Sequence, residues 1–178
     1  YLNMATKGLD YMTPRYLNPS YKHWANTHTS EHARFLLALS MASHYSGHER
    51  YKDWLDQVAG FLISHQVDCG AIQEWDNPTR DTYGTGETGI FHENGEPISD
   101  QLYTTGFAAL GLLHAYKATN DKKLLSSFTR LADYLVRIQV ESSYKRIDGG
   151  WMRAFDYGHW EHYGSSGDIG WGSHSMET

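Results

Sequence analysis

The sequence predicts an all-α fold built from repeated helical hairpins. Two segments have the hydrophobic spacing of an amphipathic helix, and each follows a segment that is apolar on nearly all sides. The two pairs recur at a spacing of roughly seventy residues, which is typical of a repeat architecture. Buried helices that alternate with half-exposed ones indicate an (α/α) toroid or an α-solenoid.

The first hairpin is expected to begin with a buried helix over residues 31–45, with Ser30 as its N-cap. A short turn over 46–48 leads to an amphipathic helix over 51–62. The polar face of this second helix carries Lys52, Asp53, Asp56 and Gln57. Its apolar face has helical spacing and consists of Tyr51, Trp54, Leu55, Val58, Phe61 and Leu62.

The second hairpin repeats this pattern. A buried helix is expected over residues 101–116, capped by Asp100 or Ser99. A short turn over 119–121 leads to an amphipathic helix over 124–138. The apolar face of that helix carries Leu124, Phe128, Leu131, Leu135 and Ile138.

The long segments between the hairpins are expected to share one face. We expect residues 1–178 to form a single (α/α)-toroid domain or a fragment of one. Its hairpins would span about 31–67 and 101–141, and its long loops about 68–99 and 142–172. Because short turns lie at one end of stacked hairpins, both long loops and the segment 13–29 should meet at the other. The buried helices begin there, so their N–H groups add donors and partial positive charge.

Composition narrows the function classes. The formal net charge of −6 leaves no basic footprint for nucleic acid, and no apolar run is long enough for a membrane helix. The single cysteine, Cys69, excludes an intrachain disulfide. His28 and His32 are spaced as zinc ligands can be, as are His44 and His48. His28 is expected to precede its helix and His48 to lie in the turn, so neither pair shares a helix face, and the sequence predicts no metal site and no cofactor.

Residues 148–177 combine aromatic rings with carboxylates and glycines, without a helical or strand period. Trp151, Trp160 and Trp171 offer faces on which the C–H side of a sugar can stack, or they cover the core at helix ends. Arg153 can bind a substrate carboxylate with two hydrogen bonds, or it can form a structural ion pair. Stacking rings beside fixed carboxylates are the features of a sugar-binding cleft.

Several motifs resemble bacterial six-hairpin (α/α)6-toroid carbohydrate-active proteins, over roughly residues 30–178. The resemblance implies a toroid of six hairpins, of which this chain supplies two and the start of a third. It also implies a glycoside hydrolase that acts on uronic-acid-containing glycans, and a secreted or periplasmic location. The motifs are Tyr83-Gly84-Thr85-Gly86-Glu87, His92-Glu93-Asn94-Gly95-Glu96-Pro97, Ser99-Asp100-Gln101-Leu102-Tyr103-Thr104-Thr105, Arg137-Ile138-Gln139-Val140, Asp148-Gly149-Gly150-Trp151-Met152-Arg153-Ala154-Phe155-Asp156 and Gly170-Trp171-Gly172 through Glu177.

Glycoside hydrolysis needs two carboxyl groups that flank the scissile bond. Glu87 and Glu93 are the leading candidates, because glycine and aromatic residues surround them rather than other charges. Asp168 either caps the next helix or faces the cleft. Asp100 and Tyr83 are candidate substrate-binding residues, although Asp100 has a strong alternative role as a helix cap.

Two other functions remain open for the same fold. A polysaccharide lyase would use a tyrosine or histidine base to remove the proton beside a uronate carboxylate. Alternatively, the chain is a non-catalytic glycan-binding toroid or a fragment with an incomplete cleft. In all three cases the expected partner is a carbohydrate, and the oligomeric state is left open. The candidate bases of a lyase are Tyr83, Tyr103, Tyr163 and His92.

Overall fold

The computed structural model describes residues 1–18, 29–47, 49–72, 98–100, 104–151 and 154–156. This part of the chain contains five helices and one sheet of two short strands, which confirms the all-α class. The elements are α1 (Leu2–Tyr16), α2 (Thr29–Ser46), α3 (Glu49–Ser64), β1 (Ile98–Asp100), α5 (Gly106–Thr119), α6 (Lys122–Arg137) and β2 (Ala154–Asp156).

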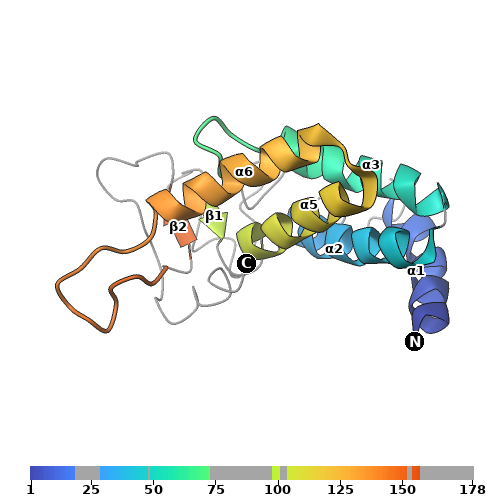
Figure 1. Ribbon diagram of the computed structural model, residues 1–178, viewed down its shortest axis with the longest axis horizontal. Coiled ribbons are helices and arrows are strands. Elements are labelled where there is room, and N and C mark those ends of the chain that lie inside the picture. The colour runs from blue at the N-terminus through green and yellow to red at the C-terminus, as the bar shows by residue number, and fades with distance from the viewer. Residues whose placement is uncertain (19–28, 48, 73–97, 101–103, 152–153, 157–178) are drawn as a thin grey trace.

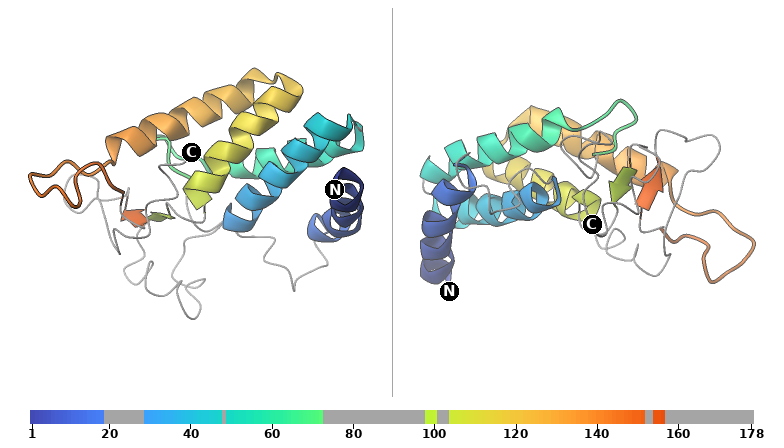
Figure 2. Two further views of the ribbon diagram at one scale, coloured as in Figure 1. Left: turned by 60° about the horizontal axis from the view of Figure 1, so that its bottom comes forward. Right: turned by 180° about the vertical axis from the view of Figure 1, so that it is seen from behind.

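Four helices form two antiparallel hairpins. α2 pairs with α3 and α5 pairs with α6, while α2 and α5 pack closely side by side (Figure 1). α2 and α5 both begin toward the end of the bundle that carries the strands. α1 crosses the bundle nearer the opposite end, and Figure 2 shows α1 and α5 on opposite sides of α2.

The core lies between the helices and is mainly aliphatic, with two fully buried tyrosines. Close approach of α2 and α5 depends on Gly111: a β-carbon placed there would lie 3.2 Å from Cβ of Leu36 and 3.3 Å from the Ala33 carbonyl oxygen. The predicted amphipathic helices are confirmed, since α3 and α6 bury their apolar faces and expose the polar ones. The largest fully buried side chains are Tyr51, Tyr134, Leu36, Leu39, Leu55, Leu62, Ile72, Leu112, Leu131 and Val58.

Both short turns lie where the sequence predicts them, and each contains a left-handed residue. Gly47 has φ of 64°, and its N–H donates to the Ser43 carbonyl oxygen over 3.1 Å. Asn120 has φ of 58° and donates to the Tyr116 carbonyl oxygen over 2.7 Å. Glycine and asparagine are the residues that tolerate this conformation at helix ends. Asp121 then caps α6 by accepting a hydrogen bond from the Lys123 N–H.

Several helix boundaries differ from the sequence prediction. Ser30 lies inside α2 and is not its N-cap, since the helix already includes Thr29. Asp100 is not a helix cap either, because it pairs in β1 and α5 begins only at Gly106. Helix α1 was not predicted. α2 is less buried than its composition suggests, since Met41 and Tyr45 are exposed.

The two strands join segments that are far apart in sequence. β1 pairs antiparallel with β2 in the register Ile98↔Asp156, Ser99↔Phe155 and Asp100↔Ala154. β1 ends the first long loop and β2 lies within the second. The two long loops therefore meet at this ladder.

Candidate functional site

The candidate site lies at the end of the bundle where α2 and α5 begin and where β1 pairs with β2, which we call the loop end. Six of the nine buried polar side chains among the described residues gather there, and the other three are Thr13, Ser40 and Ser127. Buried hydroxyl and imidazole groups must be hydrogen-bonded to be stable, so they hold this end in a defined shape. They are Thr29, Ser30, His32, Ser99, Thr104 and Thr105.

Ser99 fastens the strands to the helices. Its hydroxyl makes a short hydrogen bond with the hydroxyl of Tyr134, which is fully buried in α6. Ser99 pairs with Phe155 across the ladder, so this bond anchors both long loops to the second hairpin. A polar anchor of this kind positions a loop because either hydroxyl would lose a buried partner if the strand moved.

Trp151 lies just before β2, and it is half-buried. Its indole N–H donates to the Leu135 carbonyl oxygen over 2.8 Å, and its ring packs against the hydrophobic core. The Leu135 oxygen belongs to the last turn of α6, where carbonyl groups lack a helical partner. These contacts give Trp151 a structural role, and its use as a sugar-stacking platform stays a prediction.

The loop before Trp151 folds back on itself. Val140 N–H donates to Gly150, and Gly149 N–H donates to Val140, each over 2.8 Å. The Asp148 carboxylate accepts a hydrogen bond from the Ser142 N–H over 3.0 Å, and Gly149 has φ of 78°. Asp148 therefore belongs to an Asp-Gly turn.

Most predicted site residues lie outside the described part of the chain. For Asp100 the backbone is described, and it pairs with Ala154. Trp151 is the one candidate whose side chain is described. The predicted carboxylates and the other substrate-binding candidates lie outside the described residues: Glu87, Glu93, Asp168, Tyr83, Arg153, Trp160 and Trp171.

A buried tyrosine–histidine pair near the start of α2 was not predicted. The Tyr16 hydroxyl and His32 Nδ1 are 2.8 Å apart, and His32 stacks on Phe61 with ring centroids 3.7 Å apart. His32 is only 5% exposed. The only sequence signal was its spacing from His28, and that spacing gives no indication of a tyrosine partner from another helix.

The environment of Tyr16 disfavours it as a catalytic base. Burial of the phenol, and secondarily the charge of Glu31, raise the pKa of Tyr16 well above its usual value of 10.0. The lyase alternative needs a tyrosine that releases its proton readily, so Tyr16 is not suited to that role.

The same shift predicts a loss of stability at alkaline pH. The unfolded chain releases the phenol proton near pH 10, whereas the folded chain retains it, so this stabilisation is complete below pH 10 and falls above it. We expect wild-type stability to fall by up to about 1.4 kcal/mol per pH unit from this group. In Tyr16→Phe this fall of the free energy of unfolding with pH should be absent, as measured by urea titrations at several pH values between 9 and about 11.5. Tyr45→Phe, at an exposed tyrosine, should keep the wild-type slope.

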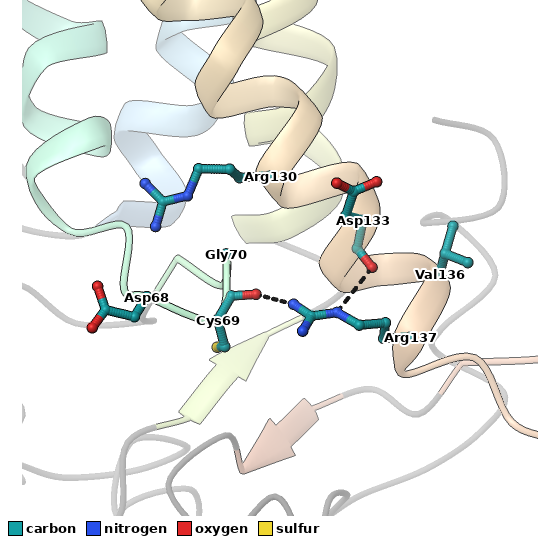
Figure 3. Close-up of a pocket in the computed structure, with 7 residues that line it drawn as sticks. All are labelled: Asp68, Cys69, Gly70, Arg130, Asp133, Val136 and Arg137. Carbon is teal, nitrogen blue, oxygen red and sulfur yellow. Dashed lines mark hydrogen bonds between the residues drawn. The ribbon is translucent and has the colours of Figure 1, made fainter.

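A second feature is a cavity of about 530 Å³ between α6 and the turn that follows α3 (Figure 3). Arg130 donates to the Val67 carbonyl oxygen over 2.7 Å, and Arg137 donates to the Cys69 carbonyl oxygen. The arginines therefore hold the turn against α6. The lining residues are Asp68, Cys69, Gly70, Arg130, Asp133, Val136 and Arg137.

Among the residues that the structure describes, no group of three or more histidine, cysteine or acidic side chains is placed to hold a metal ion. None of the described helices has the length and apolar character needed to cross a bilayer.

Comparisons of the chain with protein-family models, with curated proteins and with solved structures found no match.

Proposed function

We propose that this chain forms part of an (α/α) toroid of six hairpins and contributes to the cleft of a glycoside hydrolase. The observation that carries the proposal is the β1–β2 ladder. It holds two long loops, which carry the candidate carboxylates and tryptophans, at the end where α2 and α5 begin. Glycosidic bonds are cleaved by paired carboxyl groups, and loops on a rigid helical scaffold can bring such pairs together.

In this proposal the loops supply chemistry and the described residues supply position. Glu93 and Asp168 are the carboxyl groups proposed for acid and base or nucleophile, with Glu87 as the third candidate. Trp160 and Trp171 stack on the sugar, and Arg153 selects an acidic one. The Ser99–Tyr134 hydrogen bond and the Trp151–Leu135 hydrogen bond fix the two loops to α6.

Incubation of the protein with a panel of uronic-acid and neutral oligosaccharides tests the proposal. We expect release of reducing sugar from at least one member of the panel. Glu93→Gln and Asp168→Asn should each reduce turnover by about a hundredfold or more, because each removes a group that must exchange a proton or attack the sugar. Glu49→Gln is the matched control. Glu49 is exposed at the start of α3, far from the loop end, so this variant should keep full activity.

The same assay separates the alternatives. An increase in the ultraviolet absorbance of an unsaturated uronate would indicate elimination. The proposed activity would then be that of a lyase and not of a hydrolase. Glycan binding that is unchanged in Glu93→Gln and Asp168→Asn, with no turnover by the parent chain, would indicate a binding protein. Circular dichroism of each variant confirms that a lost activity does not reflect unfolding.

A further inference from the structure

The side of α2 that faces away from α5 is only partly covered within the described part of the chain, and it borders a groove of about 660 Å³. α1 forms the other wall, on the side of α2 that faces away from α5 (Figure 2). None of the described side chains that line this groove, which we call the α1–α2 groove, is charged. Its lining residues are Tyr1, Leu2, Ala5, Gly8, Leu9, Met12, Ala38, Met41, Ala42 and Tyr45.

The internal repeat shows what this side of α2 corresponds to. α3 and α6 have the same length, 16 residues, and the turns before them are equivalent. When Glu49 is aligned with Lys122, Ser46 aligns with Thr119. These are the last residues of α2 and α5, respectively. In this register Ala38 of α2 is the equivalent of Gly111 of α5.

The two equivalent positions have opposite environments. Gly111 is buried against α2, so closely that an added β-carbon would lie 3.2 Å from Cβ and from Cγ of Leu36. Ala38 is exposed on the floor of the groove, between the half-exposed Met41 and the helix α1. Both positions carry small residues, which allow close approach of a neighbouring helix. The side of α5 that α2 covers therefore corresponds to the side of α2 that, among the described residues, borders the groove.

We propose that the α1–α2 groove is the docking site of one further apolar helix, which runs parallel to α2 and packs on Ala38 as α2 packs on Gly111. Its contact face has the chemistry that α2 presents to α5, with alanine, leucine and serine at helical spacing. An apolar groove between two helices accepts an amphipathic helix through anchors spaced by three and four residues. Met12 and Met41 at the walls are unbranched and adapt to such anchors. The proposal is independent of glycan chemistry.

A fused helix tests the proposal in the full chain. The probe is the sequence of residues 29–46, joined ahead of Tyr1 through a short glycine-serine linker. We expect the melting temperature to rise by roughly 5 °C or more, because the helix buries its apolar face in the groove. Ala38→Glu should abolish the rise, since it places a carboxylate where the helix must pack. Val136→Glu puts the same carboxylate on an exposed apolar position of α6, outside the groove, and should preserve the rise.

The other outcomes overturn the proposal. A rise that persists in Ala38→Glu, or no rise with the fused helix, means that the groove does not receive such a helix. Sedimentation of the unfused chain addresses a second copy as the occupant. Self-association that Ala38→Glu abolishes and Val136→Glu leaves intact would assign the groove to a homodimer instead.

Discussion

Replacement of Gly70 by alanine is expected to lower the free energy of unfolding by at least about 4 kcal/mol. Gly70 has φ of 99°, a conformation that side chains oppose, and it lies in the turn after α3. A β-carbon there would lie 2.3 Å from the Arg130 carbonyl oxygen and 3.2 Å from Cβ of Tyr134. Both atoms belong to the second half of α6, whose side chains Leu131 and Tyr134 are fully buried, so the helix cannot retreat without losing its packing in the core.

Gly60→Ala is the matched control. Gly60 lies inside α3, and a β-carbon there would meet nothing within 4 Å. Alanine should therefore raise the free energy of unfolding by about 0.5–1 kcal/mol through its helix propensity. Urea unfolding followed by circular dichroism measures both variants. Equal midpoints would show that the turn does not approach α6 as closely as described.

Leu36→Ala is expected to cost about 2–5 kcal/mol of stability. Leu36 is fully buried and forms the surface on which Gly111 of α5 rests. Truncation leaves a cavity at the contact between the two inner helices, and α5 cannot move inward because Ala33 already limits its approach. The loss should appear as a lower urea midpoint with an unchanged slope.

The neighbouring residue provides the control for this substitution. Leu37 is only half-buried on the same helix, so Leu37→Ala removes the same atoms from a partly wet position. It should cost less than half as much as Leu36→Ala. A reversed order would mean that α2 is rotated about its axis relative to the structure described here.

The amphipathic helices and the short turns could be predicted because their signals are local. The alternation of apolar and polar residues in α3 and α6 requires only the helical repeat. Gly47 and Asn120 mark the turns because few other residues adopt a left-handed conformation. The buried helices were less well defined. α2 is apolar around most of its circumference, so nothing local distinguishes Leu36, which is buried, from Met41, which is exposed.

Features that depend on distant residues could not be predicted. Asp100 resembles a helix cap, but it pairs in a strand whose partner, Ala154, lies far along the chain. The need for glycine at position 70 comes from the carbonyl group of Arg130. The same holds for the candidate site, where Tyr16 meets His32 and Trp151 bonds to Leu135 only after the helices have packed.

The β1–β2 ladder also has a consequence for the order of folding. It joins positions that are 54 to 58 residues apart, and closing an open chain of that length costs about 3–4 kcal/mol of entropy. A ladder of three residue pairs recovers little of that cost by itself. Once α5 and α6 have formed their hairpin, the ends of this segment are already close and the cost has largely been met. The ladder should therefore form late in folding. The end of the molecule that carries the candidate site is then the last to acquire its native form and the first to lose it.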